Sequence, residues 1–140
     1  MMSALQAVEA FLESYWSKDH DKTLSLITDD FSWPNVALPI VSINSRSAMR
    51  EVLVNQNMGF PEPIESGHHE TLNAVAENSL VLHERVDHWV LRGTAMNCPC
   101  CAVFQVVGDK VALWRDYYDI GHVMRQFDSV GVKVDTSQWF

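Results

Sequence analysis

Residues Leu80 to Leu91 read Leu-Val-Leu-His-Glu-Arg-Val-Asp-His-Trp-Val-Leu, with apolar and β-branched residues at both ends, which is typical of a β-strand. Side chains alternate between the two faces of a strand, so Arg85, Asp87 and Trp89 share one face. If that face is buried, its charges must be paired, because an isolated buried charge is very costly. We therefore expect a polar site on one face of this strand.

A second predicted strand supplies another acid. Residues 111–119 read Val-Ala-Leu-Trp-Arg-Asp-Tyr-Tyr-Asp, which places Asp116 on one face with Trp114 and Tyr118. Two carboxylates with Arg85 between them, set among aromatic rings, are typical of a general acid/base site. The alternative is a cross-strand network of salt bridges on an exposed face of the sheet.

Length and composition narrow the class of protein. A chain of 140 residues predicts one domain over residues 1–140. A net charge of −8 argues against nucleic-acid partners and anionic membrane surfaces, which require basic patches. The beginning of the chain lacks the basic and apolar segments of a signal peptide, and no stretch is apolar enough to span a membrane. Three cysteines crowded into residues 98–101 fit a reducing compartment, so we expect a cytoplasmic location.

Hydrophobic periodicity predicts helices first and strands after, the order of an α+β fold with a mostly antiparallel sheet. We expect Asp21 to cap a short second helix that carries Leu24 and Ile27, and Asp119 to cap the last helix. The chain end, Trp139-Phe140, should pack rather than extend into solvent. The predicted helices cover residues 4–17, about 21–28, 45–59 and 120–127; the predicted strands cover 31–36, 64–76, 80–91, 97–107 and 111–119, with an irregular path over 38–41.

Three motifs together resemble the limonene-1,2-epoxide hydrolase family, from about Val8 to about Phe127. The resemblance implies a curved mixed sheet whose concave side is closed by the N-terminal helices, making a cone-shaped pocket, as in ketosteroid isomerases and polyketide cyclases. It also implies a homodimer and a one-step, cofactor-independent conversion of an apolar cyclic epoxide to a vicinal diol. The motifs are Glu84-Arg85-Val86-Asp87, Phe104-Gln105-Val106-Val107 and Trp114-Arg115-Asp116-Tyr117-Tyr118-Asp119.

The same resemblance assigns roles to individual residues. Asp116 would be the general base that takes a proton from water, Asp87 the general acid that protonates the epoxide oxygen, and Arg85 the group that holds both. Asn35 would accept a hydrogen bond from the water; a turn asparagine beside a proline is the alternative. Trp33 stands where the family has a tyrosine that helps to hold the water, and its indole N–H could donate to that water instead.

Other functions and groups remain open alternatives. The same fold hosts isomerases, cyclases and non-catalytic binders of steroid-like or terpene-like ligands, so fold does not decide function. Cys98-Pro-Cys100-Cys101 is a weak zinc motif, because it has no second cysteine pair. We expect no metal and no cofactor, and interpret the cysteines as small hydrophobic strand residues, some of them facing the pocket.

Overall fold

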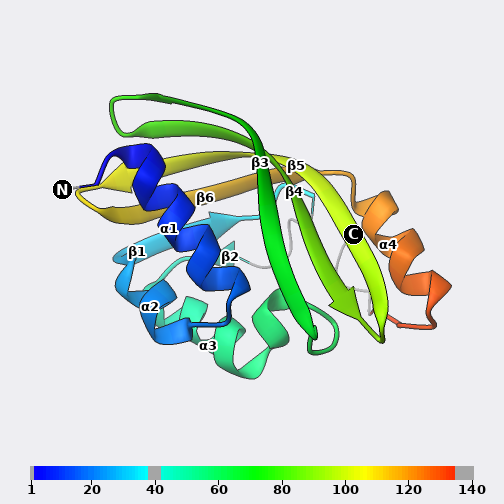
Figure 1. Ribbon diagram of the computed structural model, residues 1–140. Helices are drawn as coiled ribbons and strands as arrows, with labels where there is room; N and C mark the ends of the chain where they lie inside the picture. Colours follow the sequence, from blue (N-terminus) through cyan, green and yellow to red (C-terminus); the bar gives the residue numbers. More distant parts are fainter. Residues whose placement is uncertain (1, 38–41, 135–140) are drawn as a thin grey trace.

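The structure is a computed structural model that describes residues 2–37 and 42–134 (Figure 1). Two predictions, the irregular path of residues 38–41 and the packing of Trp139 and Phe140, lie outside the described residues. Within the described ranges, no helix combines the length and the hydropathy needed to cross a bilayer.

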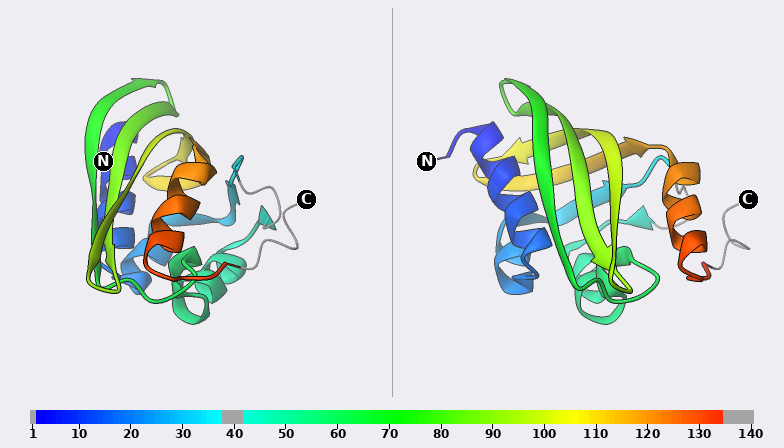
Figure 2. Two further views of the ribbon diagram at one scale, coloured as in Figure 1. Left: turned by 90° about the vertical axis from the view of Figure 1, so that its right-hand side faces the viewer. Right: turned by 45° about the vertical axis from the view of Figure 1, so that its right-hand side comes forward.

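A curved mixed sheet forms the body of the fold, as predicted (Figure 2). Its strands run in the order β2-β1-β6-β5-β4-β3, and all neighbours are antiparallel except β1 and β6, which are parallel. The last four strands in sequence form a meander of hairpins, so each one lies next to its neighbour in the chain. Their bounds are β1 Ile27–Pro34, β2 Ser42–Ile43, β3 Ser66–Glu77, β4 Leu80–Leu91, β5 Thr94–Val107 and β6 Lys110–Tyr118.

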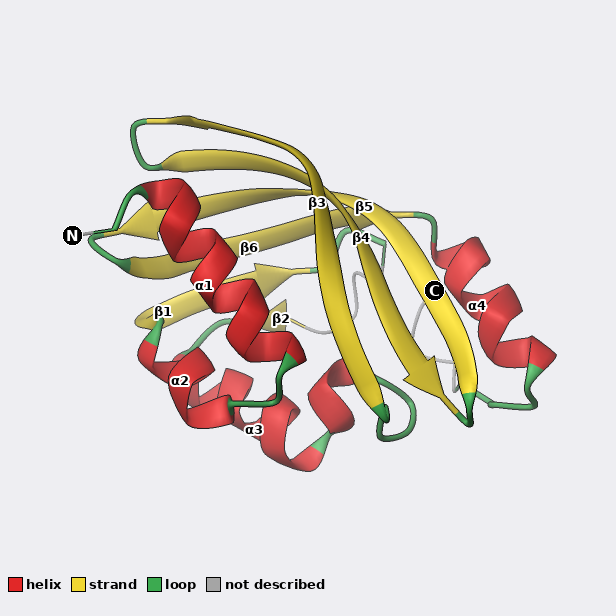
Figure 3. Ribbon diagram, viewed as in Figure 1, coloured by secondary structure: helices red, strands yellow, loops and turns green. Residues whose placement is uncertain are grey.

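Helices pack against this sheet, with the N-terminal ones together on one side and the last helix at the far end (Figures 1 and 3). The first helix begins with a capping box, in which Ser3 and Gln6 satisfy each other's backbone N–H groups. Asp119 caps the last helix as predicted, through the backbone N–H of His122. The helices are α1 Ala4–Trp16, α2 His20–Ser25, α3 Arg46–Asn55 and α4 Ile120–Ser129, with a 3-10 turn, η1, at Asn57–Gly59.

The second helix differs from the prediction. It is capped by Asp19, not Asp21, and it ends before Ile27, which starts β1 instead. The reason is tertiary: Ile27 pairs with Val111 of β6, and the N–H of Val111 donates to the carbonyl of Leu26 at 2.8 Å. A β-branched residue with an available ladder partner leaves the helix at this point.

Glu9 of α1 fastens the helix to the sheet. Its carboxylate lies 2.7 Å from His69 Nε2 and 2.8 Å from His83 Nε2, and Thr71 Oγ1 donates to it at 2.7 Å. His69 and Thr71 belong to β3, and His83 belongs to β4. One carboxylate thus joins the helix to two strands.

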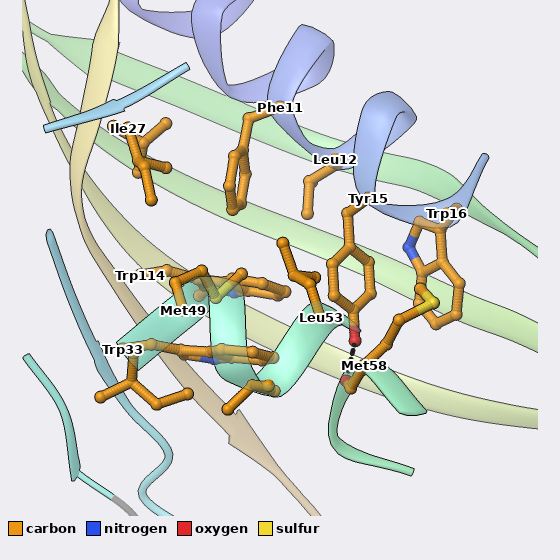
Figure 4. Packing of buried hydrophobic residues seen from close by; sticks show 14 of the residues in the cluster. Phe11, Leu12, Tyr15, Trp16, Ile27, Trp33, Met49, Leu53, Met58 and Trp114 are labelled. Carbon is orange, nitrogen blue, oxygen red and sulfur yellow. Dashed lines mark hydrogen bonds between the residues drawn. The ribbon is translucent and has the colours of Figure 1, made fainter. Parts of the chain in front are cut away.

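Stacked aromatic rings form the centre of the core (Figure 4). Trp33 of β1 lies parallel to Trp114 of β6, with ring centroids 4.1 Å apart and planes 5° from parallel. Tyr15 of α1 meets both indoles edge to face, and Phe11 meets Trp114 in the same way. These rings join the helix layer to the sheet and form one end of the pocket described next.

Candidate active site

A pocket of about 400 Å³ opens on the concave side of the sheet. Apolar side chains dominate its lining, and its few polar side chains are Asn35, Gln56, Asp87, Asp116 and the hydroxyls of Tyr15 and Tyr118. This mixture of an apolar wall and a few convergent polar groups is typical of a small-molecule site. Among the apolar lining residues are Trp16, Trp33, Ile43, Val52, Met58, Phe60, Trp89, Trp114, Val123 and Phe127.

The structure brings the predicted acids and arginine together at this pocket. Arg85 Nε donates to Asp87 Oδ1 at 2.8 Å, and its Nη2 donates to Asp87 Oδ2 at 3.2 Å. The same Nη2 donates to Asp116 Oδ1 at 3.1 Å and to Oδ2 at 3.3 Å. Arg85 is only 1% exposed and Asp116 5%, so the alternative of an exposed salt-bridge network is wrong. We call Arg85, Asp87 and Asp116 the Arg85 network.

Strand register explains this arrangement. Arg85 of β4 lies opposite Cys100 of β5, and Cys100 lies opposite Tyr118 of β6. Because side chains alternate, Asp87 and Asp116 point to the same concave face as Arg85 from two strands on either side of β5. A long arginine side chain bridges the width of that central strand.

The electrostatics of the network depend on burial. Burial raises the pKa of Asp116, while Arg85 and a 2.8 Å hydrogen bond from Trp114 Nε1 act in the opposite direction. Burial alone would lower the pKa of Arg85, but the charges of Asp116 and Asp87 outweigh it and hold that pKa well above its usual range. Arg85 is therefore a permanent cation between the two acids.

Asn35, directly after β1, reaches the site through the parallel pairing of β1 with β6. It forms a β-bridge with Asp116, and the next residue, Val36, donates its N–H to the carbonyl of Asp116 at 3.1 Å. Its side-chain Nδ2 donates to Tyr118 Oη at 2.9 Å. The predicted water-holding asparagine thus lies beside the predicted base.

Trp33 also reaches the pocket, where its indole ring forms part of the wall. Its indole lines the pocket while lying flat on Trp114. Its Nε1 is buried and has no hydrogen-bond partner in the described part of the chain. The ring is a wall of the pocket, and its service as a donor to water stays a prediction.

The three cysteines lie on both faces of β5, as the alternation of side chains along a strand requires. Cys98 and Cys100 are buried and line the pocket, whereas Cys101 is exposed on the other face. Cys100 Sγ lies 3.5 Å from Asp87 Oδ2, within reach of a weak hydrogen bond. A hydrogen bond with Cys98 and burial both raise the pKa of the Cys100 thiol, which keeps it protonated. No cluster of three or more metal-binding side chains occurs in residues 2–37 and 42–134.

Three aromatic residues have contacts in the site that the sequence did not reveal. Trp114 donates to Asp116, and Tyr118 accepts from Asn35. Tyr15 donates its hydroxyl to the carbonyl of Met58 at 2.7 Å (Figure 4). Strand alternation had placed Trp114 and Tyr118 on the face of Asp116, which was the available signal. The sequence predicted Tyr15 only as a core residue, because it lies on the apolar stripe of its helix.

Comparisons with known proteins show to which family the chain belongs. A family model described as the limonene-1,2-epoxide hydrolase catalytic domain matches residues 2–128. Epoxide hydrolase EphG of Mycobacterium tuberculosis is 29% identical over 114 residues, covering 81% of this chain and 72% of that protein.

Solved structures show the same fold. A structure of an M. tuberculosis LEH-like epoxide hydrolase superimposes with a TM-score of 0.73 at 26% identity, covering 87% of this chain and 82% of that one. A putative SnoaL-like polyketide cyclase from Shewanella denitrificans has a TM-score of 0.77 at 9% identity, covering 90% and 97%, which is a likeness of fold alone. The family match spans most of the chain and includes every residue of the Arg85 network. The chain belongs to the limonene-1,2-epoxide hydrolase family.

Proposed function

We propose that this protein is a cofactor-independent epoxide hydrolase that adds water in one step to an apolar cyclic epoxide, giving a vicinal diol. The observation that carries the proposal is one buried arginine that hydrogen-bonds two carboxylates at the wall of an apolar pocket. Two carboxylates held this close by one arginine resist ionising together, and in the proposed mechanism the pair holds one proton. One site then contains both an acid and a base.

The proposed reaction uses the two carboxylates in opposite directions. Asp116 takes a proton from a water molecule, whose oxygen attacks one epoxide carbon. The bond from that carbon to the epoxide oxygen breaks, and Asp87 delivers its proton to the oxygen. The raised pKa of Asp116 makes it a stronger base toward water. Arg85 holds both acids in place, and Asn35 accepts a hydrogen bond from the water.

The pocket favours an apolar, compact substrate. Its volume of about 400 Å³ lies within the range of small-molecule sites, and its wall is built from aromatic and sulfur-containing side chains such as Phe60, Trp89 and Met58. An isomerase or cyclase that moves a proton next to a carbonyl, or a binder without turnover, could use the same pocket. The reaction itself therefore has to be tested.

Heavy-oxygen water separates these functions. The protein is incubated in ¹⁸O-labelled water with a panel of terpene, cycloalkene and steroid epoxides. A hydrolase places one labelled oxygen in a vicinal diol, an isomerase gives an unlabelled isomer, and a binder gives no product. Asp87→Asn and Asp116→Asn should each lose at least about 100-fold in turnover, because each removes one proton transfer. Asp21→Asn, an exposed change on α2, is the matched control.

We also propose that the protein forms a homodimer through the convex face of the sheet. Val75, Leu80, Leu82 and Val107 are between 41% and 63% exposed there, and strand alternation directs all four away from the pocket. We call these four residues the convex patch. Exposed apolar side chains gathered on one face are typical of an interaction surface. We further propose a cytoplasmic location, where all three cysteines remain free thiols.

A further inference from the structure

We propose that Tyr118 is a further catalytic residue, whose hydroxyl donates a hydrogen bond to the water molecule that Asp116 activates. This inference rests on the proposed function and adds a residue to its mechanism. It concerns a phenol that is two residues from the base, on the same face of the same strand.

Three side chains converge at this point. Tyr118 and Asp116 both line the pocket from β6, and Asn35 enters from the position directly after β1, where it forms a parallel bridge with Asp116. The backbone bridge between Asn35 and Asp116, together with the 2.9 Å hydrogen bond from Asn35 Nδ2 to Tyr118 Oη, fixes the three relative to one another. A water molecule bound by Asp116 and Asn35 therefore lies next to the phenol.

The hydroxyl proton of Tyr118 is available to donate to a ligand in the pocket. A phenol has one O–H to donate, and its oxygen also accepts. The oxygen accepts from Asn35, and no acceptor in residues 2–37 and 42–134 takes the hydroxyl proton. Burial raises the pKa of the Tyr118 phenol above its usual value, so the hydroxyl keeps this proton throughout the neutral range.

The attacking water needs one donor. Its two hydrogens go to Asp116 and to the carbonyl oxygen of Asn35, one lone pair attacks carbon, and the other lone pair accepts. The hydroxyl of Tyr118 meets that need and closes a ring of hydrogen bonds through Asn35, the water and Tyr118. The indole of Trp33 meets it less well, because its Nε1 is buried while the ring lies on Trp114. No proton leaves Tyr118 in this role; it orients the water only.

Tyr118→Phe removes the hydroxyl and keeps the ring. We expect kcat to fall at least about tenfold, since a buried hydrogen bond to a positioned group is lost, while KM changes less than about twofold. Tyr117→Phe is the matched control, because it removes the same hydroxyl from the next residue, which is 46% exposed on the opposite face, and should leave kcat unchanged. The double variant Tyr118→Phe with Trp33→Tyr should recover turnover, since it supplies a phenol where the family has one.

Two results would overturn the inference. The first is unchanged kcat in Tyr118→Phe, above all if Trp33→Phe loses turnover instead. The second comes from crystal structures of the parent and Tyr118→Phe, which report on the water without any substrate. We expect one water within about 3 Å of Asp116, Asn35 and Tyr118 Oη in the parent, and its loss or displacement in the variant. A parent that holds this water but yields no labelled diol would contradict the proposed hydrolase function and not the water site.

Discussion

Replacing Glu9 with glutamine tests how much the junction between α1 and the sheet contributes to stability. Burial acts to raise the pKa of Glu9, but hydrogen bonds with His69, His83 and Thr71 outweigh it and lower that pKa from 4.5 to about 2. A change of this size corresponds to roughly 3 kcal/mol of preference for the charged, bonded form. The side chain is 36% exposed, so solvent screening reduces the figure. We expect Glu9→Gln to lower the free energy of unfolding at pH 7 by about 1–2 kcal/mol.

The contribution of Glu9 to stability should decrease as the pH falls. A carboxylate with a depressed pKa stabilises the folded state fully above its unfolded pKa, 4.5, and loses that contribution as the pH falls toward 2. The difference in unfolding free energy between the parent and Glu9→Gln should therefore be constant from pH 7 to about pH 5 and shrink below pH 4.5. Urea unfolding followed by tryptophan fluorescence at several pH values measures it. Glu13→Gln, an exposed change on the same helix, is the control. A difference that stays the same at pH 3, or that is absent at pH 7, would refute the reasoning.

Three further results are expected. Turnover should survive prolonged chelation, and elemental analysis should find no stoichiometric zinc or iron; a stoichiometric metal lost in Cys98→Ser would contradict this. Gly67→Ala should lower the free energy of unfolding by about 1–3 kcal/mol, because its Cβ would lie 2.4 Å from Trp16 Cε3; urea unfolding of the variant beside the parent measures the loss, and equal stability of the two would contradict the clash. Light scattering should find the proposed dimer in the parent and a monomer in Leu82→Glu, with the fold of the variant retained in circular dichroism; a monomeric parent, or a dimer mass that is unchanged in the variant, would argue against the convex patch.

The fold could be predicted in outline because its strongest signals are local. Alternation along Leu80–Leu91 predicted which side chains face inward, and β4 has the predicted bounds. The second helix was the clearest error, since Ile27 satisfies an apolar helical position and a strand position equally well. Only its pairing with Val111, more than 80 residues away, decides between them.

The site could be predicted less completely than the fold. Asp87 and Arg85 are two residues apart on one strand, so their proximity follows from local geometry. Asn35 and Trp33 reach the pocket through a parallel pairing that no local pattern encodes, and only the family resemblance indicated them. The hydrogen bond from Asn35 to Tyr118 depends in addition on rotamers, which a sequence does not contain.

Arg85 donates hydrogen bonds to both acids, and this arrangement affects how the site is reset at the end of each turnover. In the proposed reaction one proton leaves Asp87 and another arrives at Asp116, so the site keeps its total charge while its proton changes carboxylate. Before a second epoxide can react, the site must return to its starting tautomer. Arg85 cannot carry that proton, because it stays a cation, so the return has to pass through water or the departing diol. Asp87, with 13% of its side chain exposed against 8% for Asp116, is the end of the network more open to that exchange.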